Sequence, residues 1–179
     1  MGCNLANAEA WERCVFSHGK KRCVFISYKK EDEEAAIAIG AYLTDIVGVN
    51  IYLDTKDCIL KEAVSADNDQ LIVESIKRGL VYSSDLLCLK SDKTRLSWSV
   101  PYEIGFVDKQ EIDIAALNLK DIEDIPSYLK TKTALFDIED FLQYISRLGP
   151  YGSIMAKEDY SRFSKCDNSV LTEFIDLRE

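Results

Sequence analysis

One acidic side chain stands out in the stretch SWSVPYEIGF, residues 97–106. Pro101 suits the first position of a helix, which would make Val100 the N-cap and Glu103 the third helical residue. An acidic side chain at the third position can reach back to free backbone N–H groups. Glu103 therefore has two interpretations: it caps the helix, or its carboxylate faces a ligand.

The elements that would position Glu103 alternate between strands and helices. Five short runs rich in β-forming residues are predicted to be strands: residues 22–27, 49–53, 86–89, 112–117 and 132–136. Helical spacing of apolar residues follows four of them, at residues 35–46, 72–80, 101–107 and 138–148. Residues 54–65 are predicted to be a loop.

This alternation predicts βαβ units and an α/β fold. We expect a flavodoxin-like three-layer sandwich with a five-stranded parallel sheet in the order 2-1-3-4-5. The domain would span residues 21–150. Residues 1–20 would be an N-terminal extension, and residues 151–179 a C-terminal helical extension packed on the domain.

A ligand site is expected between the first and third strands, because open parallel sheets bind ligands where the strand order reverses. The residues that leave the first strand are Ser27, Tyr28 and Lys29, and Asp54 leaves the second strand beside them. Each also has an ordinary structural interpretation. Ser27 suits a turn, Tyr28 suits packing, Lys29 suits a solvated charge, and Asp54 suits an N-cap or a turn.

Composition excludes several function classes. The net charge of -9 argues against nucleic acid as a partner, because a backbone binder needs a positive face. The one basic cluster, HGKKR at residues 18–22, is interpreted as a solvated entry to the first strand. Six cysteines without a C-x-x-C pair, together with one His, predict no metal site.

No stretch has the length of a membrane span, and the first residues lack the apolar core of a signal peptide, so we expect a cytoplasmic protein. The absence of G-x-G-x-x-G argues against a dehydrogenase. A phosphoacceptor receiver would need acidic residues where this chain has Ser27-Tyr28 and Leu89-Lys90.

Three segments, in order, resemble TIR (Toll/interleukin-1 receptor) domains. CVFISYKKED resembles their first signature, and GVNIYLDTKD resembles their second strand and the start of their BB loop. ESIKRGLVYSSDLLCLKSDKTRLSWSVPYEIGF resembles the bacterial pattern of helix, SS turn, strand, Trp and Glu. The resemblance covers residues 22–148. Many bacterial members have Trp four residues before the Glu, where this chain has Ser99, and we interpret Trp98 as the remaining member of a tryptophan pair.

The resemblance implies an enzyme that cleaves the nicotinamide–ribose bond of NAD⁺, with NAD⁺ as substrate and no cofactor. The products would be nicotinamide and ADP-ribose or a cyclic ADP-ribose. Glu103 would be catalytic: it would face the ribose and stabilise its developing positive charge, and we expect it to be ionised at pH 7. The side chains that would contact the substrate are Ser27, Tyr28, Lys29, Asp54, Trp98 and Tyr102.

The resemblance also implies partners. TIR domains self-associate so that a neighbour's BB loop, here beginning at residues 54–57, closes the site, and an isolated monomer would be weakly active. In the Thoeris anti-phage system the nucleotide product activates a downstream effector. The alternative is a non-catalytic TIR module that only assembles with other TIR domains or with a receptor. An enzyme requires Glu103, and a scaffold does not.

Overall fold

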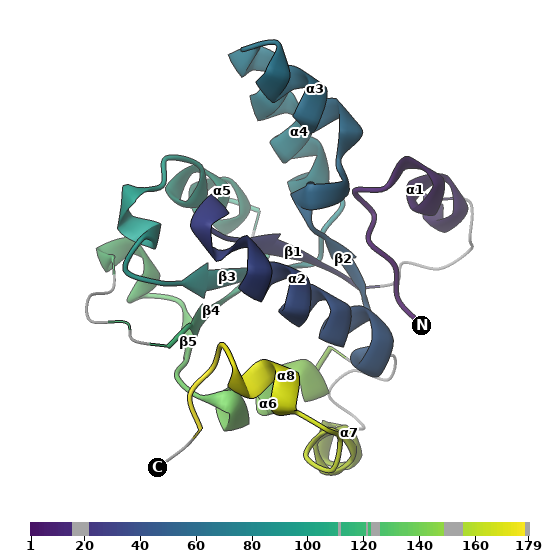
Figure 1. The fold of residues 1–179 in the computed structure, drawn as a ribbon, viewed down its shortest axis with the longest axis vertical. Helices are drawn as coiled ribbons and strands as arrows, with labels where there is room; N and C mark the ends of the chain where they lie inside the picture. The colour runs from purple at the N-terminus through teal and green to yellow at the C-terminus, as the bar shows by residue number, and fades with distance from the viewer. Residues whose placement is uncertain (16–21, 111, 121, 123–125, 149–155, 178–179) are drawn as a thin grey trace.

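The computed structural model describes residues 1–15, 22–110, 112–120, 122, 126–148 and 156–177. Residues 18–21 of the basic cluster and the helix stop predicted at Gly149-Pro150 lie outside these ranges. One all-parallel sheet has the order β2-β1-β3-β4-β5 (Figure 1). Its strands are β1 (Cys23–Ser27), β2 (Asn50–Tyr52), β3 (Asp85–Lys90), β4 (Asp113–Asn118) and β5 (Thr133–Leu135). The predicted flavodoxin-like α/β fold is confirmed.

Helices cover both faces of this sheet, so the structure has three layers (Figure 1). The helices are α1 (Ala8–Val15), α2 (Glu33–Tyr42), α3 (Cys58–Ser65), α4 (Asp69–Val81), α5 (Ser99–Asp108), α6 (Ile138–Ser146), α7 (Ala156–Phe163) and α8 (Ser169–Thr172). One core cluster joins the sheet to α2, α6, α7 and α8, and a second joins it to α4 and α5. Among the helices of the described residues, none combines the length and the apolar character that crossing a bilayer requires.

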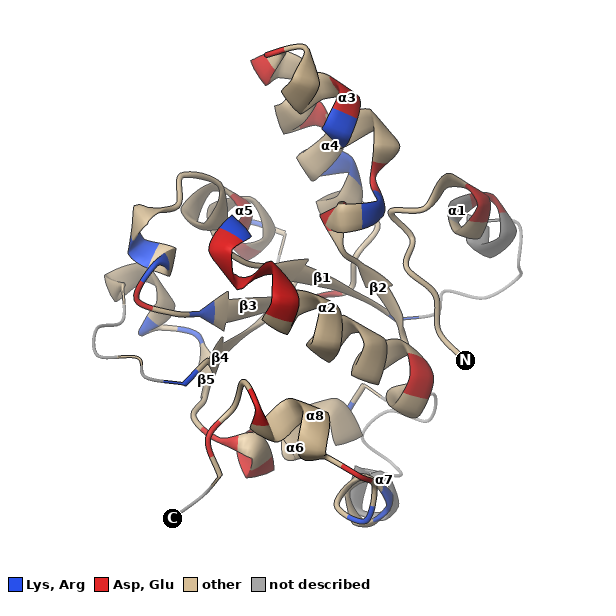
Figure 2. Ribbon diagram, viewed as in Figure 1, with Lys and Arg blue, Asp and Glu red and all other residues tan. Residues whose placement is uncertain are grey.

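The central strands form because their residues are apolar without alternation. Every residue of β1 and of β3 is buried, as expected for strands that are covered on both faces. Two acidic residues, Glu33 and Glu34, lie in the first turn of α2, where they complement its positive end (Figure 2). A π-helical turn, Leu43–Val47, continues α2, and Gly48 ends it with a φ of 82°.

The prediction of a loop over residues 54–65 is wrong, because α3 forms there. Asp57 caps this helix by accepting a hydrogen bond from the backbone N–H of Leu60 at 3.0 Å. α3 packs against α4, and Figure 1 shows the pair projecting together away from the sheet. The apolar spacing of an eight-residue helix is too short to be distinguished from that of a loop.

The first residues of the chain lie along the outer edge of the sheet. The N–H of Ile51 donates to the carbonyl of Cys3 at 3.0 Å, and the N–H of Leu5 donates to the carbonyl of Ile51 at 2.8 Å. The side chain of Asn4 both donates to and accepts from the backbone of Leu53, at 3.0 Å each. This segment pairs with the edge of β2 that the sheet would otherwise leave open.

The last described residues pack on the α2 and α6 side of the sheet. Phe163, Leu171 and Ile175 are buried in the same core cluster as those helices. The hydroxyl of Tyr42 donates to Oδ1 of Asn168 at 2.7 Å. Two backbone hydrogen bonds, from the N–H groups of residues 120 and 138 to the carbonyls of residues 174 and 176, also attach this segment.

Two helical glycines predict opposite effects of the same substitution. A Cβ atom on Gly79 in α4 would lie 2.5 Å from Cε1 of Tyr52, whereas a Cβ on Gly105 in α5 meets no atom within 4 Å. We expect Gly79→Ala to lower the free energy of unfolding by about 1–3 kcal/mol through overpacking. Gly105→Ala should raise it by about 0.5–1 kcal/mol through helix propensity. Urea denaturation of both variants measures the difference, and equal effects would contradict the packing of Tyr52 against α4.

Candidate functional site

The site lies at the carboxyl ends of β1 and β3, the point where the strand order reverses. Ser27 is the last residue of β1 and pairs in register with Cys88 of β3. Glu103 projects from α5, which follows β3, and its side chain is buried, with 6% of the residue exposed. The Ser27 hydroxyl donates to Oε2 of Glu103 at 2.5 Å. This hydrogen bond therefore joins the end of β1 to α5.

The structure excludes the interpretation of Glu103 as a helix cap. α5 begins at Ser99 rather than at Pro101, so Glu103 is the fifth helical residue and lies past the first turn. The N-cap is Trp98, whose side chain makes no cap hydrogen bond, and the Ser97 hydroxyl just before it accepts a hydrogen bond from the N–H of Val100 at 3.3 Å. Pro101 is tolerated in the first turn, because the N–H groups there have no partner within the helix.

The expectation that Glu103 is ionised at pH 7 assumed a carboxyl group with an ordinary pKa. Burial raises the pKa of its carboxyl to about 7. The hydrogen bond from Ser27 lowers this pKa, and the negative charge of Asp54 raises it. Near neutral pH the side chain therefore exists in both protonation states, which suits a group that must respond to charge developing beside it.

Asp54 supplies a second carboxylate. It lies just past the end of β2, and its Oδ1 atom accepts a hydrogen bond from the hydroxyl of Tyr28 at 2.5 Å. Burial raises the pKa of Asp54, which the hydrogen bond from Tyr28 and the charge of Lys30 oppose. Burial and the negative charge of Asp54 raise the pKa of Tyr28, so this phenol keeps its proton at neutral pH.

Both carboxylates line one cavity of about 170 Å³. Its polar lining residues are Tyr28 after β1, Asp54 after β2, and Ser99 and Glu103 of α5. Its apolar wall comes from α3 and α4: Leu60, Val64, Ile72 and Ile76. Trp98 also lines the cavity, and 62% of this residue is exposed. The cavity thus combines apolar side chains with two acidic groups.

Three of the predicted contact residues, Ser27, Lys29 and Tyr102, are not among the residues that line this cavity. The Ser27 hydroxyl instead bonds to Glu103. Lys29 points to Glu31, with 3.8 Å between Nζ and Oε2. Tyr102 packs against Phe106, with 6.4 Å between ring centroids, and its buried hydroxyl has no hydrogen-bond partner among the described residues. The side chain of Tyr102 lies one residue before Glu103 on α5 and therefore takes a different direction from the helix axis.

Sequence reasoning missed the wall that α3 and α4 contribute. Ile72 and Ile76 are visible in the sequence as a helical stripe, which indicated core packing, and they serve the cavity as well. Leu60 and Val64 lie in the segment that was predicted to be a loop, so the sequence did not indicate that they line a cavity. Ser99 also lines the cavity, as does Trp98, its neighbour in the sequence.

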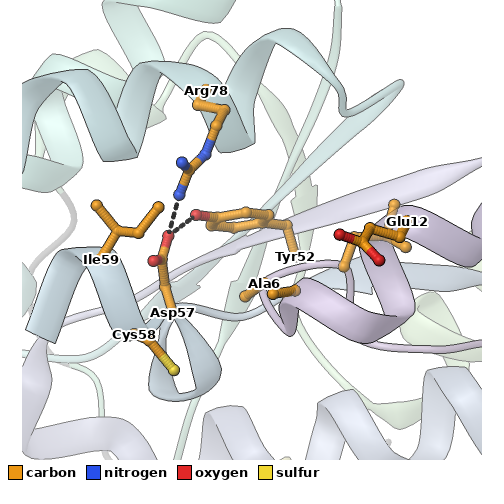
Figure 3. A pocket seen from close by; sticks show the side chains of 9 residues that line it. Ala6, Glu12, Tyr52, Asp57, Cys58, Ile59 and Arg78 are labelled. Carbon is orange, nitrogen blue, oxygen red and sulfur yellow. Dashed lines mark hydrogen bonds and ion pairs between the residues drawn. The ribbon is translucent and has the colours of Figure 1, made fainter. Parts of the chain in front are cut away.

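A second cavity, also of about 170 Å³, shares Tyr52 with the first (Figure 3). The hydroxyl of Tyr52 and Nη2 of Arg78 both donate to Oδ2 of Asp57, the latter at 3.0 Å. Cys58 and Ile59 at the start of α3 lie beside Asp57, and Ala6 and Glu12 lie on the other side of the view, beyond Tyr52. Since Tyr52 lines both cavities, this network holds the wall that separates them.

Comparison with known proteins identifies no relative of this chain. No protein-family model matches the chain, and no curated protein matches it. Within the described ranges, no group of three or more His, Cys, Asp and Glu side chains is arranged to hold a metal ion. The class that the fold and site define is a flavodoxin-like α/β protein with an acidic cavity at the reversal of strand order.

Proposed function

We propose that this protein is a TIR-type enzyme that cleaves the nicotinamide–ribose bond of NAD⁺, releasing nicotinamide and ADP-ribose or a cyclic ADP-ribose. One observation carries the proposal: a buried carboxylate, that of Glu103, lines a cavity at the point where this fold binds nucleotides. The resemblance of three sequence segments to TIR domains agrees with it in residue order and spacing.

The chemistry requires a group that stabilises positive charge on the ribose. As the bond to nicotinamide breaks, the sugar becomes oxocarbenium-like, as in glycoside hydrolysis. An ionised Glu103 in a site that excludes water would stabilise this cation strongly, because the local dielectric constant is low. The apolar wall of α3 and α4, with Trp98 at its edge, would pack against the flat nicotinamide ring.

The size of the cavity bears on how the whole substrate would bind. A volume of about 170 Å³ is below the roughly 300–1,000 Å³ usual for sites that enclose a drug-sized ligand. A cavity of this size suits the nicotinamide riboside part of NAD⁺. The adenosine part would then lie outside the cavity, on the protein surface. A second copy that contributes its α3 segment would cover that part. Ile59 and Val64 on α3 are 41% and 60% exposed, which favours such a contact.

In this proposal the product serves as a signal for a downstream effector, as in the Thoeris anti-phage system. The protein would then act by assembly followed by nucleotide release. A scaffold that only assembles would use the same exposed α3 side chains, but it would have no use for a buried carboxylate beside Ser27.

The direct test is incubation of concentrated protein with NAD⁺, followed by chromatographic separation of the nucleotides. We expect nicotinamide to appear with a specific activity that rises with protein concentration. NAD⁺ that stays intact across the concentration series, and also under macromolecular crowding, would favour the scaffold. Mass and retention time of the second product distinguish linear from cyclic ADP-ribose.

The hydrogen bond between Ser27 and Glu103 predicts a shift in the pH dependence. Activity should rise with pH as Glu103 ionises, with a midpoint near its pKa of about 7. Ser27→Ala removes the hydrogen bond that lowers this pKa, so the midpoint should move to higher pH. Ser99→Ala is the matched control: Ser99 lines the same cavity as Glu103, but its hydroxyl bonds to that of Ser97. Profiles of kcat/KM from pH 5.5 to 9 give both midpoints, and identical shifts in the two variants would argue against the assignment.

A further inference from the structure

Two consecutive residues at the end of β1 hold the two carboxylates of the site. Ser27 donates to Oε2 of Glu103, and Tyr28 donates to Oδ1 of Asp54, each at 2.5 Å. No described residue donates a hydrogen bond to Oε1 of Glu103 or to Oδ2 of Asp54. Each carboxylate is therefore held through one oxygen, its other oxygen accepts no hydrogen bond from the described residues, and both residues line the cavity.

The strand order separates these two carboxylates. β2, which precedes Asp54, and β3, which precedes α5 and Glu103, flank β1 on opposite sides. Strands in a sheet are about 4.8 Å apart, so the ends of β2 and β3 are about 10 Å apart. Glycosidases of the inverting type keep the carboxylate that activates water apart from the carboxyl group on the other side of the sugar, which leaves room for that water. Because Glu103 and Asp54 are held by different residues and follow strands on opposite sides of β1, they can do different work.

We propose that Asp54 is the proton acceptor for the hydroxyl group that attacks the ribose, while Glu103 stabilises the cation. This assignment rests on the proposed function. The bond between C1′ and the nicotinamide nitrogen breaks, and its electron pair leaves with nicotinamide as a neutral product. The oxygen of water, or of a substrate hydroxyl in cyclisation, forms the new bond to C1′. Its proton passes to Oδ2 of Asp54 and then to solvent, so atoms and charge balance.

The surroundings of Asp54 suit this role. Burial raises its pKa, which makes its carboxylate a better base than an exposed aspartate near neutral pH. Tyr28 keeps its own proton and orients the carboxylate through Oδ1. An asparagine at position 54 could still accept that hydrogen bond through its amide oxygen, but it could not accept a proton. Asp54→Asn therefore changes the chemistry and preserves the contact.

The test compares nucleophiles that do and do not carry a proton. A pyridine such as 3-acetylpyridine attacks C1′ through a ring nitrogen without an N–H, so exchange of this base for nicotinamide needs no proton acceptor. We expect Asp54→Asn to lower hydrolysis or cyclisation of NAD⁺ by about 10²-fold, within the range usual for loss of a general base. Exchange with 3-acetylpyridine should change by less than about threefold. The exposed Asp45→Asn makes the same charge change away from the site.

The outcomes separate the two proposals. A wild-type protein that consumes no NAD⁺ under any assembly condition overturns the proposed function and this assignment with it. An active wild type with an equally active Asp54→Asn overturns the assignment alone. Loss of hydrolysis without retained exchange also overturns it, because Asp54 would then serve binding or structure.

A second variant checks the hydrogen bond that orients Asp54. Tyr28→Phe keeps the ring and removes the hydroxyl that donates to Oδ1. If Asp54 is the proton acceptor, this change should lower hydrolysis by about tenfold and again leave base exchange nearly unchanged. Equal losses of the two activities in Tyr28→Phe would count against the assignment.

Discussion

Replacing Glu103 by glutamine is expected to lower the turnover of NAD⁺ by about 10²–10³-fold. This is the usual loss when one preorganised group that stabilises transition-state charge is removed. Glutamine has nearly the same shape and can still accept the hydrogen bond from Ser27, so binding of NAD⁺ should change little. Steady-state assays should show the loss mainly in kcat. Equal turnover by the wild type and the variant would exclude Glu103 from the chemistry.

The stability of this variant provides the control for folding. The pKa of Glu103 is about 7 in the folded protein, above its ordinary value of 4.5, so the folded state holds the proton more tightly than the unfolded chain. Wild-type stability should therefore fall as pH rises from about 4.5 through 7. At about 1.4 kcal/mol per unit of pKa, the ionised carboxylate destabilises the fold by about 3 kcal/mol above pH 8. Glu103→Gln should lack this decline, so it should be the more stable protein at pH 8.

Replacing Asp57 by alanine should produce the largest loss of stability. Its side chain is 2% exposed and accepts hydrogen bonds from Tyr52, Arg78 and the first turn of α3. Alanine would remove an N-cap, worth about 1 kcal/mol, and two side-chain hydrogen bonds that involve a charged group, worth about 1.5–3 kcal/mol each. Because Arg78 is 38% exposed, water can solvate it in the variant, so we expect a net loss of about 3 kcal/mol.

Thermal unfolding checks this prediction against a matched variant. At about 2–4 °C per kcal/mol for a chain of this size, Asp57→Ala should lower Tm by about 10 °C. Asp57→Asn keeps Oδ1 for the N-cap, but its amide NH2 replaces the Oδ2 atom that accepts from Tyr52 and Arg78, so its Tm should fall less than that of Asp57→Ala. A Tm of Asp57→Ala within 2 °C of wild type would show that α3 is held by other contacts.

Continuous apolar runs explain why the fold could be predicted from the sequence. Residues 22–27 and 86–89 have no polar alternation, which only strands buried on both faces require. The order of strands and helices then placed the end of the first strand, Asp54 and Glu103 at the same edge of the sheet. Their shared cavity follows from topology, because the carboxyl ends of parallel strands lie together.

The remaining features depend on tertiary contacts that no local pattern contains. α3 exists through one cap and its packing on α4, so its eight residues resemble a loop in the sequence. The start of α5 depends on the Ser97 hydroxyl, and the pKa of Glu103 depends on burial by elements far apart in the chain. Tyr102 and Lys29 lie next to true lining residues in sequence, but adjacent side chains on a helix or after a strand point in different directions.

The pairing of the first residues with β2 limits how copies of this protein can associate. An unpaired strand edge is where foreign strands add and where aggregates grow, and here the chain itself occupies that position. The opposite edge, β5, is only three residues long and offers few free hydrogen-bonding groups. Ordered filaments of this protein would therefore be joined through helices and loops, with each sheet remaining separate, and they should not show the 4.8 Å cross-β repeat.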